Sequence, residues 1–240
     1  MHRRSWLAPA TIVGCVLCAG ATNSSVGAAL ILDLSKASSD AAAVDGALFT
    51  PAHDKAHGNG SEFLRIQGTS GDGKEAGFNS VHGRPLDDKN GSKTILLSQL
   101  RPVTIEGRSY FEFILNVSEP QGGGTSSISL DALKIFASDQ PAGAALWCLG
   151  DPIFDLDAGE NRSILMHDQT NGHGKIDMIV DVPSEAFGTN GGDYVTLFSA
   201  FSSASGGAES WSALAGPIPE PLLAGAGALV GVFLVRAKRR

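Results

Sequence analysis

Two segments of the sequence alternate apolar and polar residues with a period of two, and this alternation constrains the fold more than any other feature. In "SYFEFILNV" every second residue from Phe111 onward is apolar, and Glu112 belongs to the opposite side of an extended chain. In "KIDMIVDVP" the same holds from Ile176 onward, with Asp181 on the opposite side. A strand with one apolar face buries that face and leaves the other toward solvent, so the pattern predicts an antiparallel sheet.

Short apolar segments separated by Gly-rich turns extend this prediction along the chain. Only Pro183 to Phe187 has the pattern of a helix, of about one turn that Gly188 would end. Residues 34–57 are compatible with a strand near 44–49 or with a loop. We therefore expect an all-β fold, a β-sandwich of jelly-roll type. The further expected strands are 29–34, 61–68, 93–100, 126–138, 145–149, 152–157, 162–168, 193–201 and 209–214.

The first 28 residues have the composition of a secretory signal peptide. Arg3 and Arg4 precede an apolar stretch over 7–21, and small residues offer cleavage sites after Ala21 or Ala28. A membrane anchor or a core helix is the alternative, and Cys15 would be the modified residue if the segment were a lipoprotein signal.

The last residues combine an apolar run with a basic cluster. Residues 222–235 form a 14-residue uncharged stretch, which is about 21 Å long as a helix and short for a bilayer core of about 30 Å. The residues after it, Arg236, Lys238, Arg239 and Arg240, favour the cytoplasmic side and would leave the preceding domain outside. We expect a signal peptide over 1–28, a sandwich domain over 29–214 and a tail over 215–240 with a transmembrane segment at 222–235.

Charge and cysteine content exclude several classes of protein. Residues 22–216 carry 12 Lys and Arg against 24 Asp and Glu, a formal charge of −12, which repels nucleic acid. Once the signal is removed, Cys148 is the one remaining cysteine, so an internal disulfide is excluded. Its apolar neighbours predict a small buried side chain.

The sequence has no signature of a nucleophilic, phosphate-binding or dinucleotide-binding enzyme, and we expect a protein without catalytic residues. The segment "HDKAH" has the histidine spacing of a metalloprotease helix, but Asp54 replaces the longer glutamate base. We therefore interpret His53 and His57 as loop residues.

Two groups of residues are candidates for binding. Asp155, Asp157 and Glu160 lie close together near a turn and could hold a structural calcium ion, although their spacing does not match an EF-hand loop. The alternative is that they are solvated turn residues. For contact with glycans, the aromatic residues to consider are Trp147, Tyr194 and Trp211.

The tail resembles the sorting signal of bacterial PEP-CTERM proteins. Pro219, Glu220 and Pro221 are followed by the apolar span and by the terminal basic cluster, in the order that this family has. The resemblance implies recognition and removal of the tail by an exosortase-like membrane protease, after export by the secretion machinery and signal peptidase. It also implies a location at the cell envelope, surface or extracellular matrix. Residues 130–211 are more loosely similar to the all-β ectodomains of such proteins, for which no catalytic residues are established.

Together these features predict an exported, non-enzymatic cell-surface or matrix protein associated with exopolysaccharide. We expect no cofactor apart from the calcium alternative and no nucleic-acid partner. A carbohydrate-binding module, with or without calcium, is the second hypothesis, and a surface hydrolase with two facing acids in a cleft is the third.

Overall fold

The computed structural model describes residues 30–216 apart from 37–38, 53–59, 69–70, 82–85, 88, 90–91, 120–126, 169–175 and 191. The predicted signal peptide, the "HDKAH" histidines and the tail from residue 217 lie outside the described residues. The strands are β1 (Leu30–Asp33), β2 (Ala42–Val44), β3 (Ala47–Pro51), β4 (Ser61–Ile66), β5 (Lys74–Phe78), β6 (Ile95–Leu96), β7 (Pro102–Ile105), β8 (Arg108–Asn116), β9 (Ser127–Ser138), β10 (Phe154–Asp155), β11 (Arg162–His167), β12 (Met178–Pro183), β13 (Tyr194–Ser202) and β14 (Glu209–Ala213). The helices are α1 (Ser184–Asn190) and two 3₁₀ turns, η1 (Leu97–Gln99) and η2 (Leu146–Leu149).

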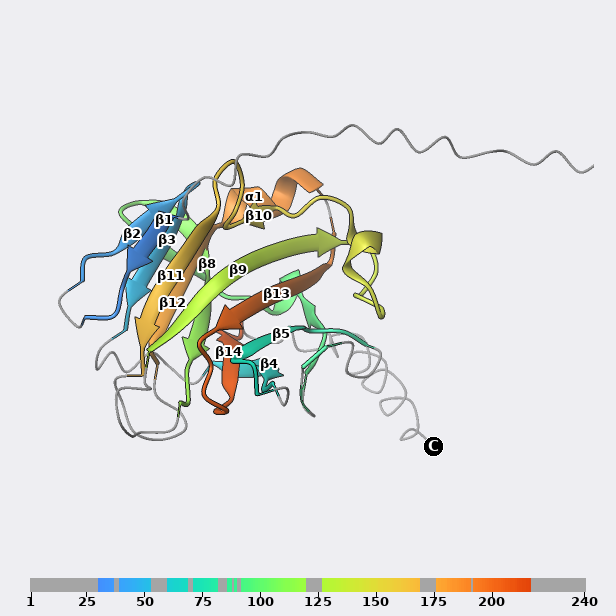
Figure 1. Cartoon of the computed structure of the whole chain (residues 1–240). Helices are drawn as coiled ribbons and strands as arrows, with labels where there is room; N and C mark the ends of the chain where they lie inside the picture. The colour runs from blue at the N-terminus through green and yellow to red at the C-terminus, as the bar shows by residue number, and fades with distance from the viewer. Residues whose placement is uncertain are drawn as a thin grey trace, which may run out of the picture.

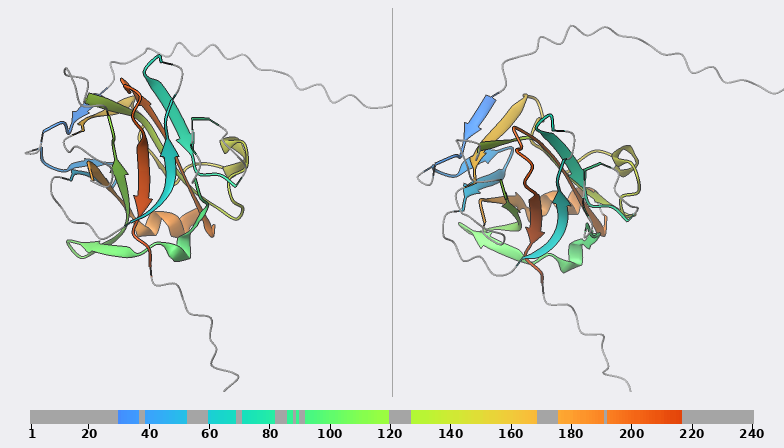
Figure 2. Two further views of the ribbon diagram at one scale, coloured as in Figure 1. Left: turned by 90° about the horizontal axis from the view of Figure 1, so that it is seen from below. Right: turned by 60° about the horizontal axis from the view of Figure 1, so that its bottom comes forward.

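The strands form two sheets that pack face to face (Figure 1). Sheet A has the order β1-β11-β9-β13-β5, with β10 beside β9 and β6 beside β13. Sheet B has the order β2-β3-β12-β8-β14-β4, with β7 beside β8. Figure 2 shows β14 between β8 and β4 in sheet B. All pairs are antiparallel except β1 with β11. The predicted all-β sandwich with almost no helix is confirmed.

The two segments with the clearest alternation become the centre of sheet B. In the register of β8 with β12, Phe113 lies opposite Val180 and Leu115 opposite Met178. All four side chains are fully buried between the sheets. The period of two in the sequence therefore identified the inner faces of both strands correctly.

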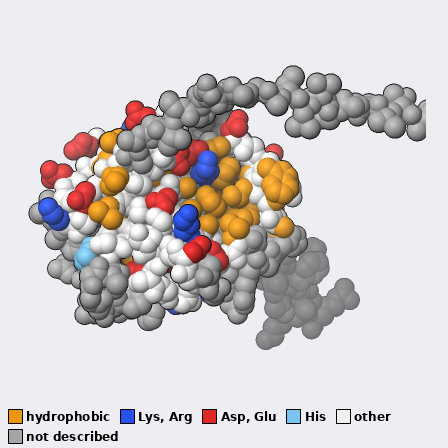
Figure 3. Space-filling view, in the orientation of Figure 1, with side chains coloured by type: hydrophobic (Ala, Val, Ile, Leu, Met, Phe, Trp, Pro, Cys, Tyr) orange, Lys and Arg blue, Asp and Glu red, His pale blue; other side chains and the backbone are white. Residues whose placement is uncertain are grey.

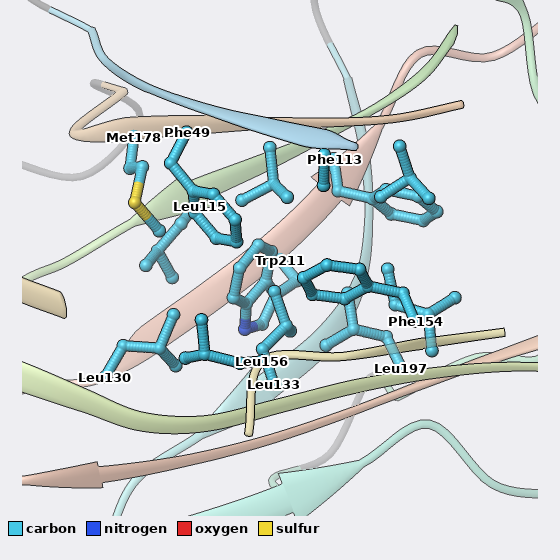
Figure 4. Packing of buried hydrophobic residues seen from close by; sticks show 14 of the residues in the cluster. Phe49, Phe113, Leu115, Leu130, Leu133, Phe154, Leu156, Met178, Leu197 and Trp211 are labelled. Atoms are coloured by element: carbon cyan, nitrogen blue, oxygen red, sulfur yellow. The ribbon is translucent and has the colours of Figure 1, made fainter. Parts of the chain in front are cut away.

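The core between the sheets is built around Trp211 (Figure 4). Its indole N–H donates to the Ser199 hydroxyl at 2.9 Å, so the polar atom of this buried ring is satisfied. Burial of one such large apolar side chain contributes about 2–3 kcal/mol. The largest fully buried side chains are Trp211, Phe49, Phe63, Phe113, Phe187, Leu64, Ile66, Leu115, Ile128, Leu130, Leu133 and Ile135.

Two tight hairpins supply strands in regions where the sequence pattern was weak. Asp45 and Gly46, between β2 and β3, have φ of 48° and 88°. Glu106 and Gly107, between β7 and β8, have φ of 50° and 83°. Positive φ at both turn residues is typical of the two-residue turns that match the twist of antiparallel strands. Residues 44–49, which the sequence left open between strand and loop, therefore belong to a hairpin.

Several sequence-based assignments of single elements were wrong. Residues 93–100 form only the two-residue β6 before η1, and residues 145–149 form no strand but contain η2. Strands β5 and β7 were not among the expected strands: β5 lies in a Gly-rich segment, and β7 begins at Pro102. Helix α1 continues through Gly188 to Asn190. Tertiary packing overrides local preference in each of these short segments.

Candidate ligand-binding groove

A groove crosses the outer face of sheet B, on the side opposite the core. It has a volume of about 540 Å³, within the range of small-ligand sites. Strands β3, β7, β8 and β12 supply most of its lining. Its apolar walls are Leu48, Val103, Ile105 and Ile179, and its polar residues are Thr50, Glu106, Tyr110, Glu112 and Asp181.

Two carboxylates lie side by side in this groove. Asp181 of β12 is directly opposite Glu112 of β8 in the sheet register, and directly opposed residues have Cβ atoms about 4.5–5.5 Å apart. Glu112 is 7% exposed and Asp181 is 4% exposed. The pair therefore brings the oxygen atoms of two carboxyl groups of low exposure together in the groove.

An aromatic ring adjoins the carboxylates. Tyr110 precedes Glu112 by two residues, so both side chains are on the same face of β8, and Val103 is opposite Tyr110 on β7. The Arg108 guanidinium lies 5.6 Å from the centre of the Tyr110 ring. Arg108 also binds Glu185 of α1, and these hydrogen bonds raise the pKa of Arg108 and lower the pKa of Glu185. Because both partners of this ion pair are well exposed, it contributes little stability.

The three aromatic residues proposed for glycan contact do not form one site. Trp147 in η2 is 85% exposed, and Tyr194 is half-buried at the start of β13. Trp211 is completely buried, so the expectation that it contacts a glycan at the surface was wrong. Its position in β14 gives it a role in packing instead.

Apolar side chains gather on the face of the molecule that carries β9 and β13 (Figure 3). The outward positions of these strands include Phe136, Tyr194 and Phe198, which alternate with core residues. Phe136 is buried, while Tyr194 and Phe198 are half-buried. A smaller groove of about 350 Å³ lies at the end of β9, beside Ser138 and Leu149.

The three acids proposed for calcium are bound to local partners. The Asp155 carboxylate accepts from the Lys134 ammonium at 2.8 Å and from the backbone N–H of Asp157 at 3.1 Å. Asp157 accepts from the backbone N–H of Arg162, whose guanidinium also pairs with Glu160. These contacts describe an ordered turn.

No three His, Cys, Asp or Glu side chains within the described ranges are placed to hold a metal ion. Cys148 is exposed, so the expectation of a buried thiol was wrong. A helix long and apolar enough to cross a membrane is absent from the described part of the chain.

A second acidic region lies between the sheets at one end of the sandwich. Glu75, Glu119 and Glu209 are at most 4% exposed. Burial, together with the nearby charges of Glu119 and Asp87, raises the pKa of Glu75 to about 7, despite the hydrogen bond that its carboxylate accepts from Gly68. Glu119 accepts from the backbone N–H of Ser205 at 2.8 Å.

Comparisons of the chain with protein-family models, curated proteins and solved structures gave no match.

Sequence reasoning did not single out Tyr110, Glu112 and Asp181. It placed Glu112 and Asp181 on the polar faces of their strands, which is where they lie. What it could not supply is the pairing of β8 with β12, because a period of two says nothing about which strands are neighbours.

Proposed function

We propose that the protein is an exported β-sandwich that an exosortase-like protease sorts to the cell surface or extracellular matrix. The order of the tail supports this: Pro219, Glu220 and Pro221, then the apolar run over 222–235, then the basic cluster. Arginines at both ends of the chain favour the same orientation, with the sandwich outside the cytoplasmic membrane. The proposed partners are the secretion machinery, signal peptidase and the sorting protease.

Intact-mass measurement of the protein from an envelope that contains such a protease tests this proposal. The wild-type chain should lack residues 1–21 or 1–28 and most of the tail. Replacing Pro219, Glu220 and Pro221 by alanine should preserve the tail, whereas Pro217→Ala, next to the motif, should be processed normally. Deletion of 217–240 should release the sandwich into the medium. A wild-type protein that keeps its tail, or a triple variant processed like wild type, would overturn the proposal.

For the sandwich itself, we propose that the groove on sheet B binds a segment of extracellular polysaccharide without cleaving it. The observation that carries this is a groove in which the half-buried apolar side chains of Leu48, Val103 and Ile105 lie with Tyr110, which is 6% exposed, and two carboxyl groups, Glu112 and Asp181. Sugars present apolar faces that pack on aromatic rings and hydroxyl groups that donate to carboxylates. A binding module and a hydrolase share these elements, so product analysis must accompany the binding assay.

Calorimetric titration of the purified full chain with a panel of oligosaccharides tests binding. Tyr110→Ala should weaken binding at least tenfold, whereas Trp147→Ala, which removes an exposed aromatic side chain outside the groove, should change it less than twofold. Chromatography of the recovered oligosaccharide should show no shorter products. Shorter products would favour a hydrolase, and a panel without any binding would refute the binding function.

A further inference from the structure

An uncharged apolar segment projects from the end of sheet A, beyond the arrowhead of β9 (Figure 1). This segment, residues 140–150, contains η2 and is called the Trp147 turn below. Trp147 is 85% exposed, and its neighbour Cys148 is exposed as well. Val81, which is 46% exposed, lies beside the turn, because its backbone N–H donates to the Ala142 carbonyl at 3.0 Å. Exposed apolar side chains that gather in one place, rather than singly, indicate a contact surface.

The chain leaves the sandwich at the same end of the fold as this turn. Ser138, the last residue of β9, is opposite Tyr194, the first residue of β13. Tyr194 is also opposite Leu96 of β6, and η1 follows directly. The Gly216 N–H donates to the Gln99 carbonyl, at the end of η1, at 2.7 Å. Successive neighbours therefore connect the end of β9 with residue 216.

The proposed membrane segment begins shortly after this point in the sequence. Leu222 follows Gly216 by six positions, so the chain between them spans at most about 21 Å. The headgroup layer on each side of the hydrocarbon core is about 5–7 Å thick. A bilayer that contains residues 222–235 would therefore lie close to the end of the sandwich that carries the Trp147 turn.

We propose that the Trp147 turn contacts the lipid interface of the membrane while the tail anchors the chain. This inference rests on the proposed sorting function and adds a second contact with the membrane. A tryptophan side chain suits this interface, because its ring is apolar and its N–H can bind the headgroups. Residues 140–150 carry no charge into the bilayer, which would be costly.

The tail is needed because the domain as a whole is acidic. Residues 22–216 have a formal charge of −12, and an anionic lipid surface repels such a charge. A short tether raises the effective concentration of a second contact to the order of millimolar, so a weak contact is still formed. Removal of the tail should therefore release the Trp147 turn from the membrane.

The test uses the protein from the envelope of a host without the sorting protease, so that the tail is retained. The protein is inserted into phosphatidylcholine vesicles that carry bromine close to the headgroup, which quenches tryptophan fluorescence at that depth. The difference between wild type and Trp147→Phe isolates the signal of Trp147 from that of the buried Trp211. We expect brominated lipid to reduce this difference signal at least twofold relative to plain lipid. Deletion of residues 217–240 should abolish the reduction.

A matched control places a tryptophan on the opposite side of the molecule. Ile31 of β1 is 61% exposed, and Figure 1 shows β1 on the side away from the Trp147 turn. Ile31→Trp, introduced together with Trp147→Phe, should not be quenched by brominated lipid. Equal quenching of this tryptophan would show that the sandwich has no preferred orientation and would overturn the assignment of the surface.

Flotation of the vesicles separates the inference from the proposal on which it rests. If the protein does not float with the vesicles, the tail is not an anchor and both proposals fail. If it floats but Trp147 is not quenched, the anchor stands and the contact of the turn is wrong. Equal quenching after deletion of residues 217–240 would overturn the dependence of this contact on the tail.

Discussion

Replacement of Glu75 by glutamine should stabilise the protein above neutral pH and leave it unchanged in acid. Glu75 is 4% exposed, and its pKa rises from 4.5 to about 7 because burial and the neighbouring Glu119 disfavour the charge. Since the folded state holds the proton more tightly, folding takes up a proton between these values, and stability falls as the pH rises from about 4.5 to 7. At 1.36 kcal/mol per pKa unit, the free energy of unfolding falls by about 3 kcal/mol over this pH range.

Glutamine has the same shape but no charge, and its amide oxygen can still accept from the Gly68 N–H at the site where Glu75 accepts now. Urea unfolding of the full chain at pH 4, 6 and 8 would measure the effect. We expect equal stability at pH 4 and up to about 3 kcal/mol more for Glu75→Gln at pH 8. The matched control Glu62→Gln removes an exposed carboxylate of the adjacent strand β4 and should change stability by less than about 0.5 kcal/mol at each pH. Parallel pH dependence of wild type and Glu75→Gln would refute this reasoning.

Three further predictions concern packing and can be checked by urea unfolding. Gly207→Ala should cost more than about 3 kcal/mol or prevent folding, because a Cβ there would lie 1.7 Å from the carbonyl oxygen of Ser118. A Cβ added at Gly188 in α1 would lie within 4 Å of no other atom, and alanine favours a helix more than glycine does, so Gly188→Ala should stabilise the protein by up to about 1 kcal/mol. Destabilisation would contradict the helical assignment. Trp211→Phe should cost about 2–4 kcal/mol through lost volume and the lost bond to Ser199, while Trp147→Ala should stay within about 0.5 kcal/mol. Equal effects of the two tryptophan changes would contradict their observed burial.

The sequence predicted the fold class well because the long strands alternate regularly. Strands β8, β12 and β13 have inner residues such as Phe113, Val180 and Leu197 at every second position, and packing between two sheets requires this. Strands β5 and β7 were not predicted, because they contain Gly77 and Pro102. Glycine and proline are depleted in β-strands. Those strands exist because a longer neighbour, β13 or β8, supplies their hydrogen-bond partners.

The candidate site was less predictable than the fold. Tyr110 and Glu112 share a face of β8 by simple alternation, but their proximity to Asp181 depends on the pairing of segments about 70 residues apart. The burial of Trp211 was also not predictable, because its neighbours in the sequence are Ser and Ala residues, as in an exposed edge strand. Its burial follows from the position of β14 between β8 and β4, which no local pattern reveals.

That same position has a mechanical consequence. A pull on the chain beyond residue 216 would load β14, which is held on both sides by β8 and β4, with further ties from Arg101 N–H to the Leu214 carbonyl and from Gly216 N–H to the Gln99 carbonyl. Force along an interior strand must break many hydrogen bonds at once, whereas a strand at the border of a sheet can peel off one bond at a time. Tension applied through the C-terminal side of the sandwich is therefore carried by β14 together with its two neighbours, β8 and β4.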